Sequence, residues 1–334
     1  MGYRGIRMSA VPKNTYDHAL DPYVRAYDLG EIQRVWPASH GIENQNYFIE
    51  ASKDEHLSTF VLTIMREASF AGDSYVPMMR YLDGLGLPVA SPLSNVSGEA
   101  ITKVDDQYCL LQQKLSGQHP VNPTLKQIQA LARFTGRMHQ ASVGWNVSLA
   151  DYPRDSAWLN TQADTVREHF AYSDRAFLDD NLRQTKSMLG RSDTKNLPRG
   201  LIHGDLFRDN VLFNERGITG VLDFHHAATG FFIYDLAVTA NDWCNDASGY
   251  LDPDRTIALL RSYNQIRPLT DVEVWLFPTF SAYAALVFWL SRAVAVVRSQ
   301  TDDSLRTKDP EEFKRILRHV HKNPFYFDIR QLRG

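Results

Sequence analysis

Apolar and polar residues alternate along the first third of the chain in the way that β-strands require. Three segments between residues 32 and 66, IQRVWPAS, NQNYFIEAS and STFVLTIMR, carry β-branched or aromatic residues at strand-like spacing. Residues 72–85 predict a helix that is closed by glycines, and residues 99–115 predict two more strands around a turn of two aspartates. We therefore expect a small lobe built of strands and one helix.

A helical pattern replaces this alternation after Ser116. Residues 124–142 place apolar residues near positions i, i+3, i+4 and i+7 after an Asn-Pro start. The helical trend continues at residues 174–190, 254–266, 273–298 and, after an acidic helix start, 309–322. The sequence therefore predicts an α+β protein with two lobes, a strand-rich N-terminal lobe of residues 1–115 and a larger, mainly helical lobe of residues 116–334.

The composition is that of an ordinary soluble globular protein. The 334 residues are 43% hydrophobic and 22% charged, and the net charge of −3 gives no electrostatic reason to expect nucleic acid or an anionic membrane as a partner. Cys109 and Cys244 cannot by themselves build a disulfide framework or a zinc site, so a cytoplasmic location is expected. The first residues lack the apolar region of a signal peptide, and Met8 is an alternative start to Met1. The oligomeric state and any feedback control stay open.

One apolar stretch is long enough to raise the question of a membrane span. Residues 274–291 contain no charged residue, which reaches the lower limit for a spanning helix. Glu273 and Arg292 bound the stretch tightly, and Pro278 and three Ser or Thr residues interrupt it. A buried helix of a soluble protein explains this stretch better.

Candidate chemistry gathers in LIHGDLFRDNVLFNERGITGVLDF, residues 201–224. Asp205 follows His203 by two positions and Asn210 follows Asp205 by five, and an apolar hairpin then brings Asp223 back toward the same point. Kinases need a base that orients an alcohol, and two oxygen ligands that hold Mg²⁺ against the phosphates of a nucleotide. The spacing therefore predicts an ATP-dependent kinase with Asp205 as the catalytic base and Asn210 and Asp223 as Mg²⁺ ligands.

Other polar residues near this stretch have less distinct expected roles. His203 is expected to be a buried histidine that hydrogen-bonds the loop, and Asp235 is expected to cap or brace the catalytic loop from the start of a helix. His225, His226 and the segment 241–244 lack the spacing of a zinc site. They are expected either to face the substrate or to pack.

The nucleotide is expected to bind two segments around the strand-rich lobe. Residues 40–52 lie where a phosphate-covering hairpin belongs, and their polar turn offers donors to phosphate oxygens, although an ordinary polar hairpin has the same composition. The residues predicted to contribute are Gly41, Glu43, Asn44 and Asn46. The segment after the apolar run YCLL, with Gln113 and Leu115, is expected to link the lobes and to receive the adenine ring with its backbone.

These motifs resemble those of the aminoglycoside phosphotransferase-like kinases, which share the protein-kinase fold and include the choline kinases. Within that family the chain resembles the bacterial homoserine kinases. The shared segments are YDLG at 27–30, GIENQNYF at 41–48, FVLTIMRE at 60–67, HGDLFRDNVLF at 203–213, LDFHHA at 222–227, YDLAVTANDWC at 234–244 and FWLSR at 288–292. The resemblance implies a two-lobed protein-kinase-like fold, ATP and Mg²⁺ as cofactors, and transfer of the γ-phosphate of ATP to the hydroxyl of L-homoserine in threonine biosynthesis.

One position departs from the general kinase pattern. The strand that carries a phosphate-binding lysine in most kinases has Thr63 at that place, and the following predicted helix has no glutamate to pair with a lysine. The homoserine kinases that the chain resembles share the threonine. Mg²⁺, loop amides and an arginine must then balance the phosphate charge. Of the two candidates, Arg66 and Arg208, the latter is preferred because it lies within the catalytic loop.

The implied substrate needs a cation for its carboxylate and an anion for its ammonium group. Arg292 is the predicted partner of the carboxylate, and Asp209, Asp242 or the amide of Asn241 is the predicted partner of the ammonium group. Two alternatives stay open. The first is a kinase for another small amino alcohol or an aminoglycoside, although residues 225–245 are not especially acidic, as a polycation would favour. The second is a nucleotide-binding regulator without catalysis, which the missing lysine suggests.

Overall fold

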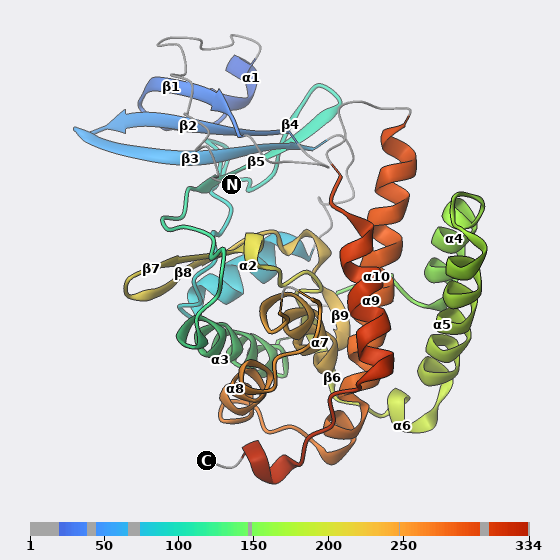
Figure 1. The fold of residues 1–334 in the computed structure, drawn as a ribbon. Helices are drawn as coiled ribbons and strands as arrows, with labels where there is room; N and C mark the ends of the chain where they lie inside the picture. The colour runs from blue at the N-terminus through green and yellow to red at the C-terminus, as the bar shows by residue number, and fades with distance from the viewer. Residues whose placement is uncertain are drawn as a thin grey trace, which may run out of the picture. The chain divides into compact units, whose positions relative to one another are not determined.

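The computed structural model describes residues 20–38, 45–65, 74–145, 149–246, 248–300 and 307–332. The chain forms two compact units (Figure 1). The sheet unit comprises Met1–Val76 and Ala90–Lys114, and the helical unit comprises Pro77–Val89 and Leu115–Gly334. That residues 1–115 and 116–334 are two functional lobes remains a prediction. By its contacts, the stretch Pro77–Val89 groups with the helical unit.

The sheet unit contains a five-stranded antiparallel sheet in the order β1-β2-β3-β5-β4. Its strands are β1 (Glu31–Pro37), β2 (Gln45–Lys53), β3 (His56–Met65), β4 (Thr102–Val104) and β5 (Gln107–Gln113). Alternate residues enter the core, where Ile49 and Ala51 of β2 pack in one cluster with Leu62 and Ile64 of β3 and with Leu111 of β5. The short helix α1 (Asp21–Val24) adds Tyr23 and Val24 to this cluster. The alternation holds along β2, whereas consecutive residues at the end of β3 and in the middle of β5 are buried on both faces of the sheet.

The helical unit holds the other helices. They are α2 (Tyr75–Gly84, which begins in the sheet unit), α3 (Leu125–Ser142), α4 (Ser156–Val166), α5 (Tyr172–Gly190), α6 (Ser192–Lys195), α7 (Phe232–Trp243), α8 (Pro253–Asn264), α9 (Asp271–Ser299) and α10 (Pro310–Lys322). Capping boxes at Thr124 and Thr270 fix the starts of α3 and α9, because each threonine and the third helical residue satisfy each other's backbone N–H groups. The expected helices are therefore present, whereas α4 is not among those that the sequence pattern predicts.

Helix α9 forms the centre of the helical unit. It packs against α10, α7 and α4, and Figure 1 shows α9 and α10 side by side. Among the described residues it is the one helix long and apolar enough to cross a membrane, and 67% of its most apolar window is buried inside the protein. Leu286 and Trp289, for example, are almost completely buried. This stretch is therefore a core helix, as its tightly bounded and interrupted sequence predicts.

Two small strand pairs support the loops of interest in the helical unit. Strand β6 (Arg199–Ile202) pairs with β9 (Ala228–Phe231), and β7 (Val211–Asn214) pairs with β8 (Gly217–Val221). The second pair is the predicted hairpin, with Asn214 opposite Gly217 at its turn. Gly217 has a φ of 134°, a conformation that side chains disfavour. The fold is thus α+β, with an antiparallel sheet followed by a mainly helical part, as predicted.

Candidate active site

The mouth of the β7–β8 hairpin brings Asn210 and Asp223 to one place. Val211 pairs with Val221 at the end of the hairpin, and the backbone N–H of Leu222 donates to the carbonyl oxygen of Asn210 at 2.8 Å. Asn210 ends a 3₁₀ turn just before β7, and Asp223 follows just after β8. The hairpin therefore joins two of the predicted site residues by its ladder of backbone hydrogen bonds.

Asn210 also fixes the candidate base. Its Nδ2 donates to the backbone carbonyl of Asp205 at 2.8 Å and to Oδ2 of the Asp205 carboxylate at 2.9 Å. Burial raises the pKa of Asp205, and the positive charge of Arg154 opposes that rise. Because both contacts use the amide nitrogen of Asn210, its Oδ1 is the atom that remains able to ligate a cation.

Asp223 differs from Asp205 in its exposure. Its side chain is 42% exposed, and its backbone has the left-handed values φ 61° and ψ 53°, which aspartate tolerates better than most residues. His225 Nε2 lies 3.8 Å from Asp223 Oδ1, but burial lowers the pKa of His225 to about 4. His225 is therefore neutral at neutral pH, so it adds no positive charge beside Asp223.

These two residues fit a magnesium ion that is shared with phosphates. Mg²⁺ takes hard oxygen ligands and usually keeps several waters, so one carboxylate, one amide oxygen and phosphate oxygens form a suitable set. Within the described ranges, the chain has no cluster of three His, Cys, Asp or Glu side chains that would hold a metal ion by itself. The donor set therefore suits a cation that arrives with a nucleotide.

His203 ties the catalytic loop to the hairpin. The residue is fully buried, and its Nε2 donates to the carbonyl of Leu222 at 2.8 Å, while its Nδ1 accepts the backbone N–H of Asp205 at 3.3 Å. Burial lowers the pKa of His203, so the neutral ring that these two contacts require is the favoured form. One side chain thus bonds to the backbone of Asp205 and to the residue before Asp223.

Asp235, at the start of α7, holds the same loop from inside the helical unit. Its carboxylate accepts the backbone N–H groups of His203 and Gly204, both at 2.8 Å, and Nε2 of His139 at 3.1 Å. His139 Nδ1 in turn accepts the hydroxyl of Tyr263 at 2.7 Å. Asp235, His203 and His139 are all fully buried. These contacts are those of a bracing residue, which is the role that the sequence predicts for Asp235.

The network continues beyond Tyr263 to a buried ion pair. Arg267 donates to the Tyr263 hydroxyl at 3.1 Å and to Glu273 at 2.9 Å, and Glu273 also caps α9. Helices α3, α7, α8 and α9 therefore all contribute to the support of the loop that carries Asp205. Buried polar networks of this kind are stable only when each member is paired.

Arg208 is engaged by an acidic residue of α7. Its backbone N–H donates to Asp242 at 2.7 Å, its guanidinium lies 3.1 Å from the same carboxylate, and Nη1 donates to the carbonyl of Val121 at 3.0 Å. Burial raises the pKa of Asp242, and Arg208 opposes that rise. The proposed roles of Arg208 toward phosphate and of Asp242 toward substrate therefore compete with this pair. Asp209 is paired with Lys308 at the surface, where such a pair opens readily.

The two remaining predicted substrate residues are also engaged. Asn241 is fully buried, and its Nδ2 donates to the backbone carbonyl of Ser281 at 2.8 Å, so the structure does not bring it to the surface beside Asp205. Arg292 Nη1 lies 2.6 Å from Glu312 and donates to the carbonyl of Asp309 at 3.0 Å. The predicted contact of Arg292 with a carboxylate requires that this ion pair opens.

The nucleotide-binding predictions fall mostly on the sheet unit. Gly41, Glu43 and Asn44 lie outside the described residues, as does the alternative phosphate ligand Arg66. Asn46 Oδ1 accepts the hydroxyl of Thr63 at 2.8 Å across β2 and β3. Gln113 is exposed at the end of β5. Leu115, which belongs to the helical unit, packs on Gly220 of β8.

Two further residues beside Asp205 were not expected from the sequence. Tyr152 lies against Gly204, because a Cβ atom on that glycine would be 3.0 Å from the Tyr152 ring, and its hydroxyl donates to Tyr234 at 2.9 Å. The positive charge of Arg154 is the largest influence that lowers the pKa of Asp205, against the rise caused by burial. Both precede α4, whose N-cap Asp155 was the available signal in the sequence.

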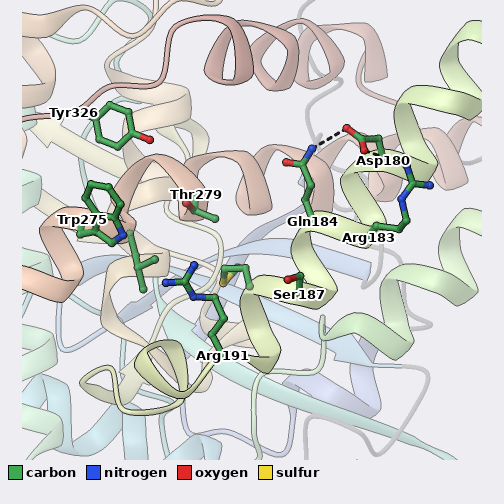
Figure 2. Close-up of a pocket in the computed structure, with 10 residues that line it drawn as sticks. Asp180, Arg183, Gln184, Ser187, Arg191, Trp275, Thr279 and Tyr326 are labelled. Atoms are coloured by element: carbon green, nitrogen blue, oxygen red, sulfur yellow. Dashed lines mark hydrogen bonds and ion pairs between the residues drawn. The ribbon is translucent and has the colours of Figure 1, made fainter.

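Cavities elsewhere in the helical unit do not coincide with Asp205. One of about 450 Å³ lies where α5 faces α9, and Figure 2 shows Gln184 and Ser187 opposite Trp275 and Thr279 there. None of the predicted site residues lines it. A second, of about 210 Å³, is bordered by Arg208 together with residues of α7 and α10.

The chain is similar to known phosphotransferases. Residues 34–269 match the phosphotransferase enzyme family. The chain is 31% identical over 320 residues to a homoserine kinase of Polaromonas naphthalenivorans, covering 95% of this chain and 99% of that protein. It is 33% identical over 301 residues to a homoserine kinase of Methylobacillus flagellatus, covering 90% and 92%.

The fold is similar to that of solved phosphotransferase structures. An amicoumacin kinase in complex with AMP-PNP and Ca²⁺ matches with a TM-score of 0.69 at 21% identity, covering 95% of this chain and 97% of that one. At this identity the likeness concerns the fold alone. Together with the relatives that match over nearly their whole length, it shows that the chain belongs to the phosphotransferase enzyme family and has the protein-kinase-like fold of that family.

Proposed function

We propose that this protein is an ATP- and Mg²⁺-dependent kinase that phosphorylates the hydroxyl group of L-homoserine. The observation that carries the proposal is the 2.9 Å hydrogen bond from Asn210 Nδ2 to the Asp205 carboxylate, because it joins a base to a metal ligand at the mouth of the hairpin. Relatives named homoserine kinase, matched over nine-tenths or more of this chain, support the choice of substrate.

In the proposed reaction Asp205 orients the acceptor. Its carboxylate accepts the hydroxyl hydrogen of the alcohol, so that the oxygen points at the γ-phosphorus and the proton passes to Asp205 as the new O–P bond forms. The bond from the γ-phosphorus to the bridging oxygen breaks, and ADP leaves. The Asp235 and His203 contacts keep the loop in place during this transfer, since both bond to its backbone.

Asn210 Oδ1 and the Asp223 carboxylate would hold Mg²⁺. When bound, the ion neutralises negative charge on the phosphates. The sheet unit would cover the nucleotide, with Gly41, Glu43, Asn44 and Asn46 at the phosphates, and the segment with Gln113 and Leu115 at the adenine. Thr63 supplies no positive charge at the position where other kinases have a lysine. An arginine such as Arg208 would therefore contribute positive charge to the phosphates after its ion pair with Asp242 opens.

The product would be O-phospho-L-homoserine, which places the enzyme in threonine biosynthesis and in the cytoplasm. An aminoglycoside is a less suitable acceptor. Such a polycation needs a pocket rich in unpaired carboxylates, whereas Asp209 is paired with Lys308 and Asp242 with Arg208.

Coupled ADP release tests the proposal. The purified protein is supplied with Mg-ATP and, one at a time, with L-homoserine, L-serine, choline, ethanolamine, hydroxylysine and kanamycin. Saturable ADP release confined to L-homoserine is the expected result. Turnover with another acceptor would keep the kinase and overturn the substrate, and ATP binding without turnover of any acceptor would favour a non-catalytic regulator.

A further inference from the structure

The proposed acceptor carries a carboxylate, which needs a positively charged partner close to Asp205. Arg208 and Arg292 are the arginines suggested by the sequence, and they pair with Asp242 and Glu312 respectively. Arg154 is a third arginine, and its position beside Asp205 follows from the fold rather than from any motif.

The backbone of Arg154 is held on both sides. Before it, the N–H of Tyr152 donates to the carbonyl of Thr229 at 2.9 Å, and the N–H of Thr229 donates to Ala150 at 2.8 Å, so this segment extends the β6–β9 pair. After it, Asp155 caps α4. The carbonyl of Arg154 itself accepts the hydroxyl of Tyr283 from α9. These contacts fix the point from which the side chain extends.

The guanidinium of Arg154 lies among aromatic rings. Its central carbon is 5.3 Å from the ring centre of Phe288, 5.6 Å from that of Trp158 and 6.0 Å from that of Tyr152. Aromatic rings around a cation remove part of its hydration but leave its N–H groups able to donate hydrogen bonds in fixed directions. A guanidinium group loses its hydration more easily than an ammonium group does. A planar guanidinium that has lost part of its hydration is well suited to bind a carboxylate through two parallel hydrogen bonds.

The surroundings of Arg154 lead back to Asp205. The Tyr152 ring that the guanidinium approaches lies against Gly204, the residue before Asp205. Phe288 is the ring closest to the guanidinium of Arg154. It packs edge to face on the ring of Phe207, with 4.5 Å between the ring centres, and Phe207 follows Asp205 by two residues. The effect of Arg154 on the pKa of Asp205 agrees with this proximity. The side chain of Arg154 is therefore linked to the loop of Asp205 through Tyr152 on one side and through Phe288 and Phe207 on the other.

We propose that Arg154 binds the carboxylate of the acceptor, and that this contact makes the enzyme select a hydroxy amino acid over an amino alcohol that lacks the carboxylate. The inference rests on the proposed function for the identity of the acceptor. It differs from a purely electrostatic role, in which Arg154 only stabilises the charge of Asp205. In that case every acceptor depends on Arg154 equally.

Two acceptors separate these roles. L-Homoserine and 3-aminopropan-1-ol share the hydroxyl, the amine and the spacing between them, and differ only in the carboxylate. We compare kcat/KM for both acceptors in the wild type, Arg154→Gln, Arg154→Lys and the control Arg183→Gln, which removes an exposed arginine of α5. Circular dichroism and stabilisation by a non-hydrolysable ATP analogue check that each variant is folded.

In the Arg154→Gln variant, kcat/KM for L-homoserine is expected to fall by about 10²- to 10³-fold, mainly because KM rises. The reason is that the substrate carboxylate loses its charged partner. Its kcat/KM for 3-aminopropan-1-ol should stay near the wild-type value, Arg154→Lys should be intermediate, and Arg183→Gln should resemble the wild type. An equal loss for both acceptors, or an unchanged preference for the carboxylate, would overturn the inference.

Direct binding keeps the inference testable apart from turnover. Calorimetry with L-homoserine, Mg²⁺ and the non-hydrolysable ATP analogue should detect binding to the wild type and Arg183→Gln, and weaker binding to Arg154→Gln. If the wild type binds L-homoserine through Arg154 but releases no ADP, the proposed kinase activity fails and the inferred contact stands. If all variants bind equally, or the wild type does not bind, the inferred contact is wrong.

Discussion

The catalytic loop of the helical unit and the β2–β3 strands of the sheet unit hold their polar side chains in different ways. Around Asp205, the buried side chains of Asp235, His203 and His139 connect the loop to α7, to the hairpin and to α3. Across β2 and β3, Thr63 and Asn46 share a single side-chain hydrogen bond between neighbouring strands. Helices that are distant in the sequence thus fix the loop that carries Asp205, whereas Thr63 is held by a residue of the neighbouring strand.

This difference indicates where a substitution is most damaging. A buried group that loses its partner keeps its full desolvation cost, whereas a half-buried group such as Asn46, the partner of the buried Thr63, can turn to water. We therefore expect the largest effects at Asp205 and Asp235 and the smallest at Thr63.

Replacing Asp205 by asparagine should have the largest effect on activity. Asp205→Asn removes the base but keeps the shape of the side chain, so the turnover number should fall by about 10²- to 10⁴-fold with little change in the KM for ATP. Coupled ADP release with L-homoserine measures both values. Turnover within tenfold of the wild type would mean that Asp205 is not the base.

Replacing Asp235 by alanine tests the support of the loop. The buried N–H groups of His203 and Gly204 and the ring of His139 would lose their acceptor, so the free energy of unfolding should fall by about 3–5 kcal/mol. Turnover should drop by about 10²-fold as Asp205 shifts. Urea denaturation and the coupled assay measure the two effects.

Asp180→Ala is the matched control for Asp235→Ala, because this aspartate pairs with Arg183 on the exposed face of α5. It should cost no more than about 0.5 kcal/mol. If the two variants were equally stable and active, the network around Asp235 would not support the loop.

The pH dependence should reveal the buried setting of Asp205. A base acts only when ionised, and burial raises the pKa of Asp205, so the acid limb of kcat/KM should lie above the ordinary aspartate value of about 3.9. In Arg154→Gln, assayed with 3-aminopropan-1-ol, this limb should move to still higher pH, because the positive charge that opposes the rise is lost. An acid limb unchanged by Arg154→Gln would argue against the proximity of the two side chains.

The raised pKa of Asp205 also determines whether the stability of the folded protein rises or falls with pH. The folded protein holds the proton of Asp205 more tightly than the unfolded chain does, so the stabilising contribution is complete below about pH 3.9 and is lost as the pH rises through the raised pKa. Compared with the wild type, Asp205→Asn should therefore gain stability as the pH rises from 4 to 8. If urea denaturation across this pH range showed no such gain, the pKa of Asp205 would not be raised in the folded protein.

Replacing Thr63 by valine should have the smallest effect. Thr63→Val removes the hydroxyl that donates to Asn46, which should lower the free energy of unfolding by about 1 kcal/mol. Turnover should change far less than in Asp235→Ala, since no bond to the catalytic loop is lost. A loss of turnover as large as that of Asp235→Ala would remove the contrast between the two regions.

The sequence predicted the parts of the site that depend on local spacing. The hairpin between Asn210 and Asp223, and the start of α3 at Thr124, follow from turn and capping residues close by in the chain. The two-lobed α+β fold follows from periods of two and of 3.6 residues. His203 and Asp235 were expected to support the loop, and their buried contacts agree with that role.

Contacts between distant segments could not be predicted in this way. The pairing of Arg292 with Glu312 and of Arg208 with Asp242 depends on how helices pack, and no local pattern records it. Arg154 is close to Asp205 because its segment joins β9, which is far away in the sequence. Burial of Asn241 likewise results from the packing of α7 on α9.

We propose above that the loop held by Asp235 transfers phosphate from ATP to L-homoserine through Asp205. The most direct test is a ³¹P NMR spectrum of the wild type and Asp205→Asn after incubation with Mg-ATP and L-homoserine. The wild type should form ADP and a phosphomonoester of homoserine in equal amounts, and the variant should form almost none. ADP with only inorganic phosphate, or equal product from both proteins, would contradict this proposal.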